Sequence, residues 1–467
     1  MTEPFATATD IAQAVASGER TARDQTAFAL SGIRAANPKL NCFTAVLAAR
    51  ARARAEALDA RIAAGEPGGA LAGVPFAVKN LFDIEGLATL AGSKINAERA
   101  PASRDALLIR RLENAGAILV GALGMGEYAY DFTGENQHYG PCRNPWDAGR
   151  MTGGSSSGSG GATAAGLVPF ALGSDTNGSI RVPASLCGLF GLKPTYGRLP
   201  RTGTYPFCDS LDHLGPLARS SRDLARVYDV LQGFDDGDHA CANRPTEPVE
   251  PLLDKGIDGL RFAVANGYFN CDAFPEAAAA VAAVADALGA RHSLALEGAA
   301  EGRAAAYLIT NGEGAALHRQ RLLSRPEDFD IDTRDRFLAG CLLPAAWLLR
   351  AQAVRRWWQA KMLKAFATVD VIAAPCTPCS APLLGAKTLR IDGEDQPLRP
   401  NLGLFTQPFS AIGLPVCSVP LRSAATGLPI GVQLVAPPWR EDLCLRAAAA
   451  LEALGVADCG QPPLATA

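Results

Sequence analysis

Two serines and one lysine in this chain have types and surroundings that suit nucleophilic chemistry. Every residue from Gly153 to Gly161 is Gly or Ser, and Ser179 follows in the segment Gly173-Ser-Asp-Thr-Asn-Gly-Ser179. Gly-rich backbone lets main-chain N–H groups come close to a substrate. Lys79 ends the apolar run Pro75-Phe-Ala-Val-Lys79. Ser155, Ser179 and Lys79 together predict nucleophilic hydrolysis that does not use histidine.

Ser179 is the candidate nucleophile. A serine that follows a tight turn such as Thr176-Asn177-Gly178 has its hydroxyl held outward, while the N–H groups of the turn converge on one point. Such convergent N–H groups can stabilise an oxyanion. The alternative is a Gly-rich turn whose serine caps a helix.

Lys79 is the candidate base, and Ser155 is the candidate relay between the two. Lysine has an ordinary pKa of about 10.4, so a lysine base needs burial to lower that pKa toward neutrality. A serine hydroxyl can accept a proton from one neighbour and donate its own to another. The alternatives are a strand-end lysine that reaches solvent and a flexible Gly/Ser linker.

Several other motifs are weaker. His138 and His213 are the histidines near these segments, and they leave a Ser-His-Asp triad open. Gly154–Gly158 fits G-x-S-x-G, although its context is poor for a nucleophile elbow, and Gly124–Ala129 fits a dinucleotide-type G-x-G-x-x-A. Cys376–Cys379 has the C-x-x-C spacing without a second cluster. We interpret it as a packed loop, and we expect no metal and no organic cofactor.

Composition limits the class of protein. The 467 residues carry a formal charge of −3, which favours neither nucleic acid nor an anionic membrane surface as a partner. The apolar stretch Leu342–Leu349 is too short to span a membrane. The start MTEPFATATD lacks the basic and apolar regions of a signal peptide. We therefore expect a cytoplasmic protein whose twelve cysteines are reduced.

Helical and strand patterns alternate along the chain, which predicts an α/β fold. Expected helices cover 9–17, 21–36, 43–65, 104–114, 275–288, 344–367 and 441–454. Expected strands cover 73–78, 117–120, 260–265, 293–296, 369–374 and 430–435. We expect one domain over 1–467, with N-terminal helices to 70, a core at 71–234, an acidic, Pro-rich surface linker at 235–257 and a C-terminal half at 258–467 that completes the sheet.

With these segments in place, the chain resembles the amidase signature family, most strongly over about 70–215 and through Gly191-Leu-Lys-Pro-Thr195. The resemblance implies a large mixed β-sheet core covered by helices on both faces. It also implies a Ser–cis-Ser–Lys triad, with Ser179 as nucleophile, Ser155 after a cis peptide bond and Lys79 as base. The N–H groups of Thr176, Asn177, Gly178 and Ser179 would form the oxyanion hole.

Two positions depart from the common pattern of that family. Ser157 and Asn177 stand where small residues are usual. Asparagine tolerates left-handed backbone, so we expect the oxyanion hole to survive, and the Asn177 side chain could also contact substrate.

Within the family, segments such as Leu90–Asn96 and His138–Asn144 resemble the 1-carboxybiuret hydrolase branch, which acts in cyanuric acid breakdown. That resemblance implies a small amide substrate, ammonia release through an acyl-enzyme, and a small helical partner subunit in a hetero-oligomer. A carboxylated substrate would suit a bidentate arginine, which the sequence does not single out. The main rival is the glutaminase component of glutamyl-tRNA amidotransferase, and a non-enzymatic scaffold is the third hypothesis.

Overall fold

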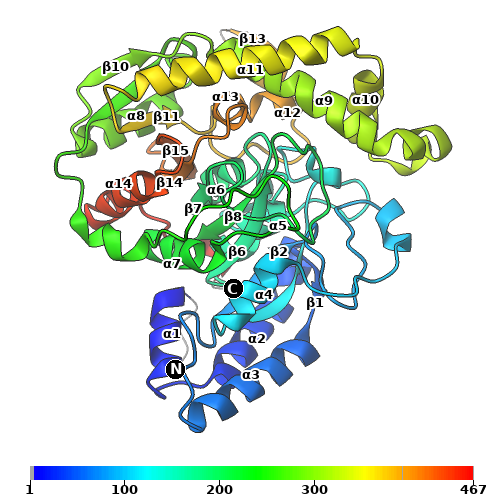
Figure 1. Ribbon diagram of the computed structural model, residues 1–467, viewed down its shortest axis with the longest axis vertical. Helices are drawn as coiled ribbons and strands as arrows, with labels where there is room; N and C mark the ends of the chain where they lie inside the picture. The colour runs from blue at the N-terminus through cyan, green and yellow to red at the C-terminus, as the bar shows by residue number, and fades with distance from the viewer. Residues whose placement is uncertain (1–4, 392, 466–467) are drawn as a thin grey trace.

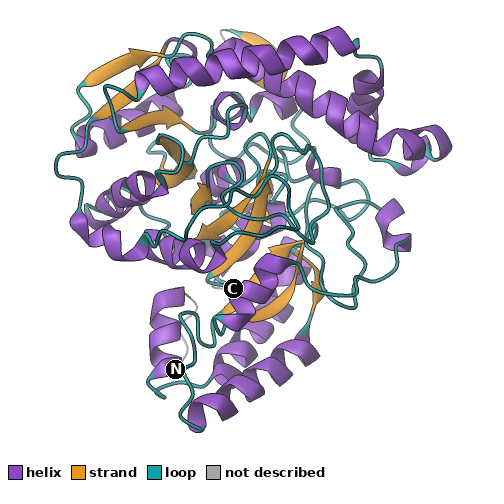
Figure 2. Ribbon diagram, in the orientation of Figure 1, coloured by secondary structure: helices purple, strands orange, loops and turns teal. Residues whose placement is uncertain are grey.

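The computed structural model describes residues 5–391 and 393–465. Its centre is a mixed sheet of eleven strands, which lie in the order β1, β3, β2, β6, β8, β7, β14, β15, β11, β9, β10 (Figures 1 and 2). In that order the bounds are Phe43–Val46, Ile118–Leu123, Pro75–Lys79, Phe170–Asp175, His213–Ala218, Phe190–Lys193, Val416–Arg422, Pro429–Val435, Val371–Pro375, Phe262–Asn266 and His292–Ala295. The expected α/β fold with a large mixed sheet is confirmed.

The central strands are apolar because both faces of the sheet are covered. Every residue of β2, β3, β6, β7 and β8 is buried. Strands buried on both faces lose the apolar–polar alternation and become nearly continuous hydrophobic runs. This explains why short runs such as Phe76–Val78 are recognisable as strands in the sequence.

Two neighbouring parallel strands position the candidate site. β2 runs parallel to β6, with Phe76 opposite Phe170 and Val78 opposite Leu172. The carboxyl ends of parallel strands meet at one edge of a sheet, so Lys79 at the end of β2 lies beside Ser174 near the end of β6. The two strands therefore bring together residues from separate parts of the chain.

The helices pack on this sheet and extend it at both ends. The α-helices α1 to α14 span Ala8–Ala16, Ala22–Leu40, Ala48–Ala63, Leu107–Asn114, Ser157–Ala164, Arg181–Cys187, Ser221–Leu231, Pro275–Leu288, Ala299–Ser324, Ile331–Cys341, Ala345–Ala365, Leu398–Asn401, Gln407–Ser410 and Glu441–Ala453. The N-terminal helices α1 to α3 lie at one end of the molecule, and α11 crosses the opposite end, where it packs against α9 (Figure 1).

Most of the predicted elements are present, with three differences. Phe43–Val46 is strand β1 at the sheet edge and not the beginning of a helix, which starts only at Ala48. The helix expected from 104 begins at Leu107. The long helix α9 and the helix α10 were not predicted from the sequence.

Two segments expected from composition can also be placed. The stretch 235–257 lies against the body of the protein, where Asp238 pairs with Arg201 at 2.8 Å and Glu247 pairs with Arg198 at 3.0 Å. Strands on both sides of it belong to the same sheet. Within the described residues no single helix is long and apolar enough to cross a membrane; α10 and α11 qualify only together, and they are bent by 100°.

Candidate active site

Lys79 and Ser155 are in direct contact inside the protein. Lys79 Nζ donates to Ser155 Oγ at 2.6 Å and to Ser174 Oγ at 2.9 Å, and all three residues are buried. The peptide bond between Gly154 and Ser155 is cis, as the family resemblance implied. The sequence prediction missed Ser174, which becomes a neighbour of Lys79 only through the pairing of β2 with β6.

Burial lowers the pKa of Lys79 to about 7. The low-dielectric interior disfavours the ammonium form, whereas the charges of Asp175, Asp212 and Asp131 partly oppose that effect. Both hydrogen-bond partners of the amine named above are hydroxyls. A large fraction of Lys79 is therefore neutral near pH 7 and able to accept a proton.

The Gly/Ser run is a packed part of the core, not a flexible linker. Every residue from Gly153 to Gly161 is buried, and α5 begins within it at Ser157. A Cβ atom at Gly158 would lie 2.5 Å from the Cys42 carbonyl oxygen, so only glycine lets α5 approach β1 and β3 this closely. The run thus places Ser155 at a fixed position against the sheet.

Ser179 lies in the loop next to Ser155. Ser156 N–H donates to the Ser179 carbonyl at 3.3 Å, and Ser156 Oγ both donates to the Ser174 carbonyl and accepts from Ser174 N–H, at 3.2 Å each. These bonds connect the Gly/Ser run to the segment 174–179. The structure therefore brings the three sequence-predicted residues Lys79, Ser155 and Ser179 into one region.

The loop 175–181 is held by a buried ion pair. Arg181 donates to both carboxylate oxygens of Asp175 at 2.9 and 3.0 Å, and both side chains are fully buried. The Arg181 charge contributes to holding the pKa of Asp175 well below its usual range, against the opposing effect of burial. The pair clamps the two ends of the loop that carries Ser179.

The oxyanion-hole candidates occupy this clamped loop. Among the described residues, the N–H groups of Asn177, Gly178 and Ser179 donate to no acceptor within the protein. Thr176 Oγ1 donates to Asp212 at 2.7 Å. The left-handed position is Gly178, with φ of 140°, and not Asn177. The conformational tolerance expected of Asn177 is therefore not used, since the adjacent glycine takes that role.

A cavity of about 110 Å³ opens beside the nucleophile candidate. Ser179, Thr176 and Asn177 line it together with aromatic, polar and charged side chains. Its further lining includes Tyr130, Phe132, Phe207, Tyr307, Thr310, Arg336, Arg399 and Gln407. Sequence reasoning identified none of this second group, because they come from α9, α10 and distant loops without a local motif.

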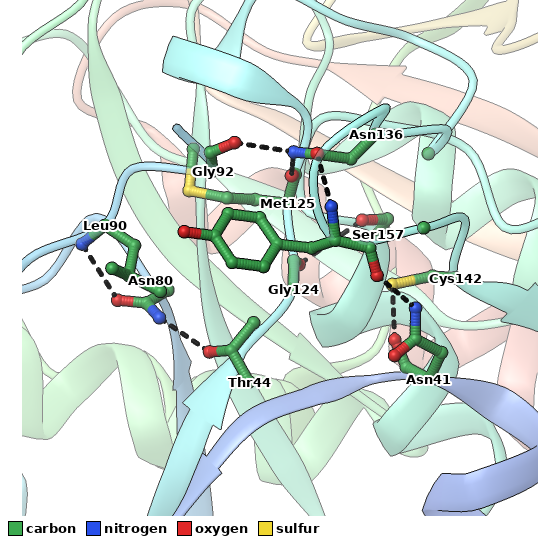
Figure 3. Close-up of a pocket in the computed structure, with 13 residues that line it drawn as sticks. Asn41, Thr44, Asn80, Leu90, Gly92, Gly124, Met125, Asn136, Cys142 and Ser157 are labelled. Atoms are coloured by element: carbon green, nitrogen blue, oxygen red, sulfur yellow. Dashed lines mark hydrogen bonds between the residues drawn. The ribbon is translucent and has the colours of Figure 1, made fainter. Parts of the chain in front are cut away.

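A second, smaller cavity lies behind the Gly/Ser run (Figure 3). Its volume of about 20 Å³ suits water-sized occupants and excludes an organic substrate. Figure 3 shows Asn136 Nδ2 between the carbonyl oxygens of Gly92 and Met125, with bond lengths of 2.7 and 2.9 Å. Because Gly126 N–H donates to the Ser155 carbonyl, this wall supports the position of Ser155.

The weaker sequence motifs have structural surroundings. His138 pairs with Glu127 at 3.0 Å, and His213 Nδ1 lies 2.6 Å from the Leu211 carbonyl, so their recorded bonds do not lead to Ser155 or Ser179. Cys376 is buried and donates to the Arg181 carbonyl. No group of three or more potential metal-binding side chains occurs among the described residues.

Comparison with known proteins agrees with this geometry. The Amidase family model matches residues 24–300 and 315–445. The chain belongs to the amidase family. It is therefore a hydrolase that acts on carbon–nitrogen bonds other than peptide bonds.

Individual relatives refine the comparison. The chain is 53% identical to AtzE, a component of 1-carboxybiuret hydrolase from Pseudomonas sp. (strain ADP), covering 96% of this chain and 98% of that protein. It is 40% identical to the GatA-type component, the first of the subunits, of the glutamyl-tRNA(Gln) amidotransferase of Anaeromyxobacter dehalogenans (strain 2CP-C), covering 91% of each. An inhibitor-bound s-triazine catabolic enzyme, described as a vestigial protein complex, superimposes with a TM-score of 0.96 at 52% identity, covering 97% of this chain and all of that one.

Proposed function

We propose that this amidase hydrolyses the terminal carboxamide of 1-carboxybiuret or a close analogue and releases ammonia. Lys79 accepts the Ser179 proton by way of Ser155, and Ser179 Oγ bonds to the carboxamide carbon. The N–H groups of residues 176–179 stabilise the oxyanion. Ser155 then returns the proton to the leaving nitrogen, the C–N bond breaks, and water releases the acid from Ser179 by the same proton path. The 2.6 Å contact between Lys79 and Ser155, which couples a partly neutral amine to the relay, carries this proposal.

Arg336 is our candidate for the group that binds the substrate carboxylate. It lines the cavity beside Ser179 and stacks 3.8 Å from the centre of the Tyr130 ring. Its guanidinium donates to the main-chain carbonyls of Asp332 and Tyr130, which leaves its positive charge without a carboxylate partner among the described residues. Arg399, the other arginine in the lining, is already paired with Asp131 and Asp332. A guanidinium with unneutralised charge in a cavity suits a carboxylate.

We also propose that the partner is a small helical protein. The support is that relatives of this chain are subunits of complexes, and that the α10–α11 junction exposes large apolar side chains. Helix α11 carries five cationic residues and no acidic one, so its outer face would repel a second copy of itself and favour a partner with acidic residues. We propose the cytoplasm as the location, which the twelve free cysteines support.

Ammonia release from carboxybiuret generated in situ, with glutamine in parallel, tests the substrate. We expect release from carboxybiuret that disappears in Ser179→Ala, and a much higher KM in Arg336→Met. Release from glutamine alone would instead identify the chain as an amidotransferase-type glutaminase.

A further inference from the structure

The side chain of Asn177 has one polar atom that nothing in the described part of the protein satisfies. Asn177 lines the cavity with Ser179 and is 7% exposed. Its Nδ2 donates to Thr310 Oγ1 at 2.9 Å, whereas its Oδ1 is buried and has no hydrogen-bond partner among the described residues. A buried polar atom without a partner is rare in proteins, because leaving it unpaired costs stability.

Thr310 fixes which end of the amide remains unpaired. Thr310 lies in α9, is fully buried and lines the same cavity. With Nδ2 held by the threonine hydroxyl, the free group of Asn177 is an acceptor. An amide oxygen accepts N–H or O–H donors and does not bind another carbonyl.

The backbone does not explain why an asparagine stands here. Gly178 takes the left-handed conformation of the loop, and the Asn177 carbonyl is fixed separately by a 2.7 Å bond from Thr406 Oγ1. The oxyanion-hole role needs only the main-chain N–H of residue 177. The side chain is therefore free to serve a different purpose at the wall of the substrate cavity.

We infer that Asn177 Oδ1 is a specificity-determining acceptor for an N–H group adjacent to the scissile carboxamide. This inference rests on the proposed function of the cavity. It selects substrates of the ureido class, –NH–CO–NH2, over amides of a carbon chain, –CH2–CO–NH2. A methylene at that position leaves the buried oxygen unsatisfied, and sites with buried polar groups reject analogues that lack the matching donor.

Two stable compounds of equal length isolate this contact. 3-Ureidopropionate and glutaramate both carry a carboxylate and a terminal carboxamide, and they differ in one N–H that replaces one CH2. Calorimetric dissociation constants measured on the full chain in a Ser179→Ala background avoid turnover. We expect 3-ureidopropionate to bind about ten-fold more tightly than glutaramate.

Variants assign the preference to this atom. Asn177→Ala should bring the ratio of the two dissociation constants close to one, and Asn177→Asp, which keeps an acceptor oxygen, should preserve most of the preference. Thr310→Val leaves Asn177 in place but releases its amide, so the ratio should fall to an intermediate value.

Equal affinities in the Ser179→Ala background, no binding of either compound, or a preference that persists in Asn177→Ala would overturn the inference. Failure of the proposed function would look different, since the Ser179 enzyme would then release no ammonia from carboxybiuret, whatever the binding ratio.

Discussion

At the scale of single residues, catalysis depends on a lysine that is uncharged at neutral pH. Burial lowers the Lys79 pKa to about 7, so the neutral fraction rises as the pH increases through that value. We predict that kcat/KM increases with pH along a rising limb with an apparent pKa of about 7. A pH profile of ammonia release measures it, and a profile flat from pH 5 to 9 would contradict the role of Lys79 as base.

Ser174 should tune that lysine. Its hydroxyl accepts a 2.9 Å hydrogen bond from Lys79, a bond that stabilises the ammonium more than the amine. Ser174→Ala should therefore move the rising limb to lower pH, while Ser174→Thr restores the hydroxyl and the original limb. A general structural weakening would lower the rate without moving the limb.

Gly178 should be intolerant of any side chain. Its φ is 140°, and an added Cβ would lie 2.1 Å from Thr406 Oγ1. We predict that Gly178→Ala lowers kcat about 100-fold or more by displacing the oxyanion-hole N–H groups. The same variant with Thr406→Ser tests the clash, because only the conformational cost should remain if Thr406 is pushed aside.

The sequence was sufficient for the residues whose role depends on local backbone. Lys79, Ser155 and Ser179 stand in an apolar strand end and in Gly-rich loops, and these local contexts made them recognisable. Ser174, Thr310 and Arg336 were not found, since each acquires its contact through packing with a distant segment.

At the scale of secondary-structure elements, the loop between β6 and α6 depends on the Asp175–Arg181 pair. Removing one partner of a buried pair leaves the other charge unpaired, at a cost of about 3–5 kcal/mol. We predict that Asp175→Asn lowers the free energy of unfolding by that amount in urea denaturation. Asp286→Asn, which breaks an exposed pair with Arg291, is the matched control and should change it by less than about 1 kcal/mol.

The elements that the sequence did not reveal owe their conformation to tertiary contacts. Helix α9 contains Gly302 and Gly314, which disfavour a helix in isolation. Both are needed for close packing, because a Cβ at Gly302 would lie 2.6 Å from Trp358 and one at Gly314 would lie 2.5 Å from Phe337. The Trp357-Trp358 pair in α11 divides as its pattern indicated, with Trp358 buried and Trp357 exposed.

At the scale of the whole molecule, one exposed surface is unusually apolar. Between Phe337 and Leu349 the chain has no charged residue, and Leu342, Trp347 and Leu349 are 84%, 56% and 73% exposed. Contiguous apolar surface of this kind marks association sites. We predict that the isolated chain associates weakly as its concentration rises, and that Leu342→Ser with Leu349→Ser reduces this in light scattering. Equal association of both proteins would show that another surface is responsible.

The order of the eleven strands could not be read from the sequence. Strands β9, β10 and β11 follow the 235–257 segment yet extend the sheet that β2 and β6 begin. Such long-range pairing depends on which edges meet during folding, and no local pattern encodes it.

The most direct test of the account is to find which residue forms a covalent bond. A fluorophosphonate probe reacts with an activated serine, and peptide mass spectrometry then locates the modified residue. We predict modification of Ser179, with a labelling rate that rises with pH around 7 and is lost in Lys79→Ala. Modification of Ser155 in place of Ser179, or none in a protein that releases ammonia, would contradict the proposed mechanism.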